Sequence, residues 1–239
     1  MADHVLSLSK YLAVAGISAR RKAVDLIKAG KVAVNGTIVT HPAHRIFPGD
    51  VVAVQGKTVK PQIELRYIML NKPLGVVSTA SDEHGRPTVL ELIDMDERLY
   101  PIGRLDINTT GIILLTNDGA LAHQLAHPSF EISKKYRVHL DKPVLKEHMA
   151  AVRLGIVLPD GPIAVDAITY SNRTHTQVDV TLHSGRNRIV RRIFKYMGYQ
   201  VLSLDRIGYA NLTLEGLANG QWRVLTHEEV DVLKKKVQP

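Results

Sequence analysis

The 239-residue sequence contains no cysteine and few aromatic residues, with one Trp and three Phe. The absence of cysteine excludes disulfide bonds, thiolate metal sites and cysteine nucleophiles, and it agrees with a protein of the reducing cytosol. No apolar run approaches the roughly 20 residues that span a bilayer. The first residues also lack the basic and apolar segments of a signal peptide. We therefore expect a cytoplasmic protein with no membrane partner.

Two phosphate-binding patterns are also missing from the sequence. It has no GxGxxG after an apolar strand and no GxxxxGK[ST], which argues against dinucleotide, P-loop and Rossmann-type methyltransferase chemistry. His123 and His127 have the spacing of a helical zinc pair, but Gln124 stands where HExxH has its Glu. Capping or packing is the expected role of both histidines. We therefore expect no cofactor and no metal.

Positive charge is concentrated in the first quarter of the chain. The whole sequence carries a net charge of +8. Residues 1–60 hold nine basic and three acidic residues, a net +6. Such asymmetry indicates a module that binds a polyanion. Nucleic acid is favoured over an acidic membrane surface, because no long amphipathic helix with a bulky apolar face is present.

Two short helices and a small β unit are expected in this basic segment. Ser7 and Ser18 stand where N-caps would begin the helices, and Gly16 and Gly30 stand where left-handed C-terminal caps would end them. An Asn-Gly pair at residues 35–36 then predicts a β-hairpin. The segment therefore has the pattern of a compact α+β module.

Three cations, Arg20, Arg21 and Lys22, occupy the first turn of the second expected helix. Positive charge at a helix N-terminus opposes the macrodipole and weakens the helix by several tenths of a kcal/mol. A bound phosphate would relieve this conflict. We assign these residues, with Lys28 and Lys31, to nucleic-acid binding; the alternative is a solvated basic face.

A linker around Pro61 separates this module from a larger domain, so we expect domains at residues 1–62 and 63–239. In the larger domain, apolar or alternating runs predict strands and a turn at residues 117–119 predicts a capped helix. The expected strands are residues 67–70, 112–116, 136–140, 178–182 and 200–204, and the expected helix is 120–126. No regular βαβ rhythm appears, which indicates a mixed α+β domain.

A carboxylate and a guanidinium lie two residues apart just before one of these strands. Arg104 and Asp106 belong to the loop that leads into residues 112–116. Two unit charges about 4 Å apart attract by roughly 4 kcal/mol at an intermediate effective dielectric, which favours an ionised carboxylate in a partly dry site. Asp106 is therefore a candidate nucleophile or base, and a structural ion pair is the alternative.

A second cluster of cations follows a glycine turn near residue 185. Arg186 precedes an expected helix, and Arg188, Arg191 and Arg192 fall at helical spacings of three and four. We expect these three to share one side of that helix while apolar residues face the core. Such a face suits a phosphate backbone or an anionic partner in a cleft, and we assign Arg186, Arg188 and Arg192 to nucleic-acid binding.

Four segments together resemble known families. Residues 5–60, centred on SARRKAVDLIKAGKVAVNG, resemble the S4 RNA-binding domain. GRLDINTTGIILLTNDG, SKKYRVHL and GRNRIVRRIF, in this order, resemble the RsuA-type ribosomal RNA pseudouridine synthases over essentially the whole chain. The resemblance implies an α+β fold, with a small N-terminal S4 (αL-like) domain and a catalytic domain whose mixed, mainly antiparallel sheet is flanked by helices.

The same resemblance implies a role for each matching residue. Asp106 would be the essential carboxylate, either attacking as a nucleophile or taking the C2′ proton. Arg104 would help to displace the target nucleotide, and Tyr136 would stack on the uracil. Arg191 would be a closer charge partner of Asp106 than Arg104 is. Leu204 falls near the apolar residues that form the floor of the uracil pocket.

We therefore expect a cofactor-free enzyme, acting as a monomer, that isomerises uridine in ribosomal RNA, with the large subunit favoured over the small. A non-catalytic S4-containing factor that binds ribosomal RNA or assists ribosome assembly is the alternative. A methyltransferase is disfavoured by the missing glycine-rich loop. Which uridine is modified, and whether one or several are, stays open.

Overall fold

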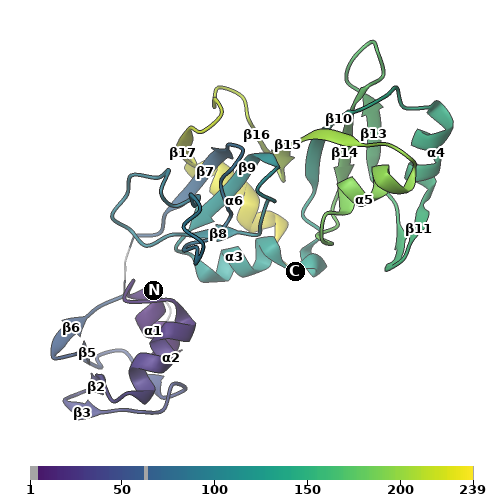
Figure 1. Ribbon diagram of the computed structural model, residues 1–239. Coiled ribbons are helices and arrows are strands. Elements are labelled where there is room, and N and C mark those ends of the chain that lie inside the picture. Colours follow the sequence, from purple (N-terminus) through teal and green to yellow (C-terminus); the bar gives the residue numbers. More distant parts are fainter. Residues whose placement is uncertain (1–4, 62–63, 239) are drawn as a thin grey trace. The chain divides into compact units, whose positions relative to one another are not determined.

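The computed structural model describes residues 5–61 and 64–238. The chain divides into two compact units, residues 1–65 and 66–239 (Figure 1). The boundary predicted from the sequence, between residues 62 and 63, lies outside the described residues. Each unit is described by itself.

Unit 1 combines two helices with two small sheets. Strands β3, β2, β5 and β6 form a four-stranded sheet in that order, and β1 pairs with β4. Its elements are β1 (Leu6–Ser7), α1 (Leu8–Val14), α2 (Arg20–Lys28), β2 (Val32–Val34), β3 (Thr37–Ile38), β4 (Arg45–Ile46), β5 (Val52–Val54) and β6 (Lys57–Val59). A buried cluster that includes Leu8, Leu12, Ile27, Val32 and Val52 joins the helices to the strands.

The turns of unit 1 follow the sequence prediction. Gly16 and Gly30 follow the two helices with φ of +75° and +67°. Asn35 and Gly36 both have positive φ, at 51° and 82°, as the tight turn between β2 and β3 requires. Only residues that tolerate the left-handed region fit these positions without strain.

The predicted serine caps are not formed. Helix α2 begins at Arg20 with Ala19 as its N-cap, and the Ser18 hydroxyl donates instead to the Ala19 carbonyl at 3.3 Å. Ser18 therefore lies one residue too early to reach the first free amides of the helix. Ser7 is the N-cap of α1, but its hydroxyl accepts no hydrogen bond from a backbone amide of the helix and instead lies 3.4 Å from the Ser9 hydroxyl.

Unit 2 is built on one large sheet with helices beside it. The strand order is β13-β14-β10-β15-β9-β7-β17, with β16 beside β15 and β8 beside β9. The strands of unit 2 are β7 (Tyr67–Lys72), β8 (Tyr100–Ile102), β9 (Thr110–Thr116), β10 (Lys134–Leu140), β11 (Ile156–Leu158), β12 (Gly161–Ile163), β13 (Ala167–Tyr170), β14 (Gln177–Leu182), β15 (Val201–Tyr209), β16 (Leu212–Thr213) and β17 (Trp222–Val224). Strands β11 and β12 pair with each other in a separate two-stranded sheet. The helices are α3 (Gly119–Ala126), η1 (Pro128–Phe130), α4 (Lys146–Leu154), α5 (Ile189–Tyr196) and α6 (His227–Lys236). The mixed, mainly antiparallel sheet expected from the resemblance is confirmed.

A short parallel joint connects the two halves of this sheet. Strands β9 and β15 run parallel and meet in two register pairs, Thr110 with Asp205 and Gly111 with Arg206. Gly111 has φ of +103°, and a Cβ built on it would lie 2.3 Å from the Arg206 carbonyl oxygen. The strands can approach this closely because position 111 has no side chain.

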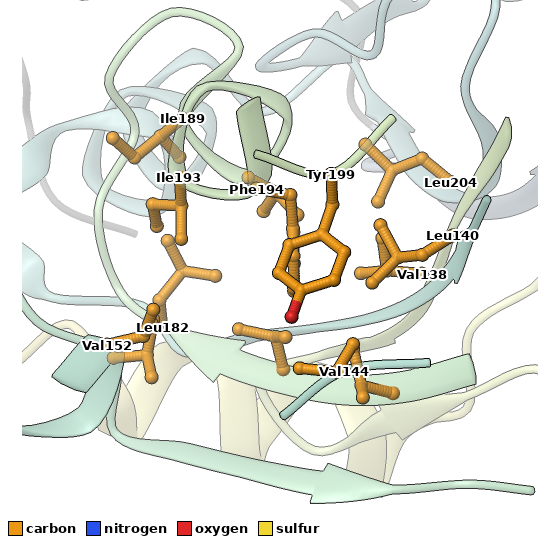
Figure 2. Packing of buried hydrophobic residues seen from close by; sticks show 14 of the residues in the cluster. Val138, Leu140, Val144, Val152, Leu182, Ile189, Ile193, Phe194, Tyr199 and Leu204 are labelled. Carbon is orange, nitrogen blue, oxygen red and sulfur yellow. The ribbon is translucent and has the colours of Figure 1, made fainter. Parts of the chain in front are cut away.

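Each half of the sheet has its own apolar core. In one half, Ile193 and Phe194 of α5 pack with Val138 and Leu204 around the Tyr199 ring (Figure 2). In the other half, residues of β9 pack against α3 and α6, as in the buried cluster of Ile112, Leu114, Leu121, Leu125, Val230 and Leu233. The pocket described below lies where the two halves meet.

The helix predicted after the Asn-Asp-Gly turn is confirmed. The Asp118 carboxylate accepts hydrogen bonds from the amides of Ala120 and Leu121 at 3.0 and 3.1 Å. It also accepts one from the Tyr67 hydroxyl at 2.8 Å, which ties the start of α3 to β7. Among the described residues, no helix is long and apolar enough to cross a membrane.

Candidate active site

A pocket of about 370 Å³ opens at the joint of the unit 2 sheet. Six of the residues that the sequence singled out line it, and they come from the loop before β9, from β10, from the turn before α5 and from β15. These six are Arg104, Asp106, Tyr136, Arg186, Arg188 and Leu204. Lys134, Arg206 and Tyr209 also line the pocket, although they were not predicted as site residues.

The loop that carries Asp106 is held at each of its neighbouring residues. The Ser78 hydroxyl donates to the Leu105 carbonyl at 2.9 Å and accepts from the Leu105 amide at 3.1 Å. The Gly75 amide donates to the Ile107 carbonyl at 3.1 Å. Arg191 donates to the Asn108 carbonyl at 2.6 Å. These contacts fix the position of the Asp106 backbone before any substrate binds.

Arg188 is the ion-pair partner of Asp106. Its guanidinium lies 2.8 Å from the Asp106 carboxylate, and the two side chains are 49% and 31% exposed. Arg188 is not part of α5, because it is the N-cap residue and has a left-handed backbone, with φ of +49°. The sequence analysis expected Arg191 to be a closer charge partner of Asp106 than Arg104 and did not predict this direct contact with Arg188.

Arg191 instead ties α5 to the Asp106 loop. Besides its bond to the Asn108 carbonyl, its guanidinium lies within 3.5 Å of the Thr109 hydroxyl and the Val201 carbonyl. Burial, and then the charge of Arg188, lower the pKa of Arg191, while Asp106 acts in the opposite direction. Arg191 is thus an electrostatic neighbour of Asp106 that positions its loop.

Tyr136 and Leu204 lie on one face of the sheet and both line the pocket. Tyr136 pairs in register with Arg206, and Val138 pairs with Leu204 on the same two strands. Because side chains alternate along a strand, residues 204 and 206 point to the same side. Arg104 is exposed at the edge of the pocket, and the described residues include no hydrogen-bond or ion-pair partner for it.

The model of the RNA pseudouridylate synthase family matches residues 66–196, which include the Asp106 loop, Tyr136 and α5. The chain belongs to this family. An S4 domain model matches residues 7–52. The protein is therefore an RNA pseudouridine synthase with an N-terminal S4 domain.

Similar proteins extend this match to nearly the whole synthase. The ribosomal large subunit pseudouridine synthase B of Bacillus subtilis is 41% identical, over 95% of each chain. The dual-specificity RNA pseudouridine synthase RluF of Escherichia coli is 34% identical, over 99% of this chain and 81% of its own. A crystal structure of a pseudouridylate synthase superposes with a TM-score of 0.68 at 31% identity, covering 95% of this chain and 99% of the other.

Two of the predicted RNA-binding arginines of the synthase share one carboxylate. Arg192 and Arg186 both bind Asp160, which is 45% exposed. Together they hold the pKa of the Asp160 carboxyl well below its usual range. Arg188, Arg191 and Arg192 reach different partners, and Arg188 precedes α5 instead of lying on it, so the expectation that all three share one side of the helix is wrong.

Lys72 is a buried cation that the sequence analysis did not assign to the site. Its side chain is fully buried, and its ammonium donates to the carbonyls of Pro73 and Val76 at 2.8 Å each. These bonds shape the turn whose Gly75 amide contacts the Asp106 loop. Burial lowers the pKa of Lys72 to about 8, and the negative charge of Asp106 acts in the opposite direction.

The buried Lys72 should make the stability of the synthase depend on pH. Its pKa is about 8 in the folded chain and has the ordinary value of 10.5 when unfolded. Between these values the unfolded state binds more protons, so the free energy of unfolding gains a contribution that rises with pH. Below the folded pKa this contribution stays constant. Urea titrations across this pH range should show a smaller rise in the free energy of unfolding for Lys72→Met than for the wild type.

Lys146→Met is the control for this measurement, because Lys146 is exposed in α4. It should retain the pH dependence of the wild type. If the free energy of unfolding rises equally with pH in the wild type and in Lys72→Met, the lowered pKa is wrongly assigned to Lys72.

The cations predicted to bind RNA in the S4 domain are exposed. The first turn of α2 contains no acidic residue and is formed by Arg20, Arg21 and Lys22. Lys28 lies in the last turn of α2, and Lys31 follows it just before β2. Their role in RNA binding stays a prediction.

His123 and His127 stack on each other, with ring centroids 5.4 Å apart. The His127 ring also accepts from the Ser129 amide at 3.3 Å, which caps η1. Among the described residues, no group of three or more His, Asp or Glu side chains could hold a metal ion.

Proposed function

We propose that the synthase converts a uridine of large-subunit ribosomal RNA into pseudouridine, with Asp106 as the reacting carboxylate. The observation that carries this proposal is the placement of Asp106 on a restrained loop inside a pocket that Tyr136 and Leu204 also line. The choice of ribosomal RNA follows the Bacillus subtilis relative, which is named a ribosomal large subunit enzyme.

The reaction begins when the target nucleotide leaves its stack, which costs a few kcal/mol. Arg104, exposed at the pocket edge, is suited to fill the space that the nucleotide leaves. The Tyr136 ring then offers an aromatic face to the uracil, and Leu204 an apolar contact. RNA contacts made elsewhere on the protein offset the cost of unstacking.

Asp106 acts on the sugar once the nucleotide is in the pocket. The N1–C1′ bond breaks and its electron pair leaves with the base. Asp106 either bonds to C1′ or removes the C2′ proton. The base then rotates and C5 bonds to C1′; this displaces Asp106 from C1′ in the first route and is accompanied by return of a proton to C2′ in the second. The proton on C5 is then lost and N1 takes up a proton. Arg188 pairs with the Asp106 carboxylate in the free enzyme and lies beside the reacting atoms.

The direct test uses transcripts of large-subunit ribosomal RNA that contain C5-tritiated uridine. The purified synthase should release tritium, and pseudouridine mapping should place the product at defined positions. The same positions should contain uridine in ribosomal RNA from a strain that lacks the gene. Failure to release tritium from any ribosomal RNA, as transcript or assembly intermediate, would refute the proposed substrate.

The S4 cations should contribute to affinity through phosphate contacts. Each lost contact removes about 0.7 to 0.9 from the slope of log affinity against log salt. Arg21→Gln/Lys22→Gln should therefore weaken RNA binding and reduce the slope by about 1.5. Fluorescence anisotropy over a range of salt concentrations measures both quantities.

The matched control removes one arginine and one lysine from α4, as Lys146→Gln/Arg153→Gln, and should leave the slope unchanged. A salt slope that does not change in the S4 variant would refute the role of these cations.

We also propose that the enzyme acts as a monomer in the cytosol, where ribosomal RNA is found. Sedimentation of the purified protein should give the mass of one chain, both alone and at the concentrations used for activity.

A further inference from the structure

Arg206 is a buried cation that faces the pocket. It lies on β15 directly opposite Tyr136, and its side chain points to the same face of the sheet as the side chain of Leu204. The residue is 3% exposed, and it lines the pocket. It therefore contributes to the same wall as the two residues proposed to hold the base.

The guanidinium of Arg206 is not saturated by the protein. Its Nε donates to the Ile112 carbonyl at 2.6 Å, and its central carbon, Cζ, lies 5.2 Å from the centre of the Tyr209 ring. Its Nη2 is buried and has no hydrogen-bond partner in the described part of the chain. Leaving a buried charged donor unpaired is costly, so such a group indicates a missing acceptor.

No carboxylate neutralises Arg206 among the residues that the structure describes. The neighbouring Asp205 accepts from the Thr110 hydroxyl at 2.9 Å and lines a different pocket, away from Tyr136 and Leu204. Asp106, the acid that lines the site, is paired with Arg188. The charge of Arg206 is therefore available to a ligand.

Lys134 supplies a second positive charge beside Arg206. Its ammonium donates to the Ile132 and His183 carbonyls at 3.0 and 3.1 Å. Burial, and then the charge of Arg206, lower the pKa of Lys134 to about 8. Two cations that repel each other across one pocket wall both gain when an anion binds between them.

We propose that Arg206, assisted by Lys134, binds a carbonyl oxygen of the target uracil and stabilises the negative charge of the base after the N1–C1′ bond breaks. The inference rests on the proposed function, in which the base lies against Tyr136. The electron pair of the broken bond leaves with the base and is shared between N1 and the carbonyl oxygens. This holds whether C1′ bonds to Asp106 or C2′ loses its proton, and the charge is lost when C5 bonds to C1′.

The experiment compares two bases that differ in the stability of their anions. Fluorine at C5 stabilises the uracil anion, so cleavage of the N1–C1′ bond depends less on a cation in the protein. Single-turnover rates are measured at saturating enzyme on transcripts made with uridine or with 5-fluorouridine. Mass spectrometry of nuclease digests follows the loss of the starting nucleoside at the target, which reports cleavage in both cases.

Arg206→Met should slow cleavage at uridine by about 10² to 10³, the loss typical of removing one donor to a developing anion. At 5-fluorouridine the loss should be at least about ten times smaller, with RNA affinity unchanged. Arg206→Lys should recover part of the uridine rate. The matched control is Arg137→Met, on the opposite face of the same sheet, where Arg137 pairs with Asp179; it should keep the wild-type rate.

Three results would overturn the inference. An equal loss for both bases would assign Arg206 to positioning alone, and weaker RNA affinity with an unchanged saturated rate would assign it to a backbone phosphate. If Arg206→Met does not fold, as judged by thermal unfolding, Lys134→Met is tested in its place and should show the same dependence on the base. If the wild type does not convert uridine, the proposed function itself fails, whereas an active wild type with an unaffected folded variant refutes only the role of Arg206.

Discussion

Asp106→Asn is expected to reduce pseudouridine formation by about 10⁴-fold or more, the loss seen when an enzyme loses a residue that acts directly on the reacting bond. Asparagine keeps the shape of the side chain, but it neither attacks C1′ nor takes a proton from C2′. The fold should survive, because the pair with Arg188 is partly exposed and contributes about 1 kcal/mol or less. Single-turnover tritium release measures the first effect, and thermal unfolding measures the second.

Asp160→Asn is the matched control for this variant. It removes another carboxylate that pairs with arginine, but Asp160 is not among the residues that line the pocket. It should retain most of the activity. Undiminished tritium release by Asp106→Asn would refute the proposed mechanism. Equal rescue of an assembly defect in a deletion strain by Asp106→Asn and by the wild type would indicate a non-catalytic role on the ribosome.

Gly111→Ala is expected to destabilise the catalytic unit by about 3 to 5 kcal/mol, combining overpacking with a strained backbone. The new Cβ would lie 2.3 Å from the carbonyl oxygen and 2.6 Å from the amide nitrogen of Arg206. Both are backbone atoms, so no side chain can rotate to relieve the clash. The φ of +103° is also unfavourable for alanine. Urea unfolding monitored by the fluorescence of Trp222, in β17 of unit 2, measures the loss in the free energy of unfolding.

Gly216→Ala separates the two contributions. Gly216 has φ of +70°, but a Cβ there would meet no atom within 4 Å. This variant should therefore lose only about 1 to 2 kcal/mol, the cost of a left-handed backbone. A loss at Gly111 no larger than the loss at Gly216 would show that the β9–β15 contact relaxes easily.

Local features of the fold could be predicted from the sequence because short segments determine them. The Asn35-Gly36 turn and the Asp118 cap depend on a few adjacent residues, and both are confirmed. The apolar runs in β9 and β10 were also sufficient to predict these two strands. Strand β15, however, continues to Tyr209, five residues beyond its predicted end at residue 204. Hydrophobic alternation does not reveal this extension, since buried Arg206 interrupts it.

The charge pairs of the site could not be predicted in the same way. Arg188 reaches Asp106 because it precedes α5 in a left-handed conformation, which its side chain does not specify. Asp160 meets Arg186 and Arg192 only through tertiary folding. The pattern that predicted a basic helix face contained the right residues, but it assumed that the helix began earlier than it does.

The β9–β15 joint has a consequence for the width of the site. Asp106 comes from the loop ahead of β9, whereas Tyr136 and Arg188 come from the half of unit 2 that contains β10 and α5. A rotation of one half against the other would therefore separate the carboxylate from the aromatic ring and stretch the Arg188 contact. Backbone packs directly on backbone at Gly111, so such a rotation is strongly restricted. The sheet itself therefore fixes the width of the gap into which a nucleotide must fit.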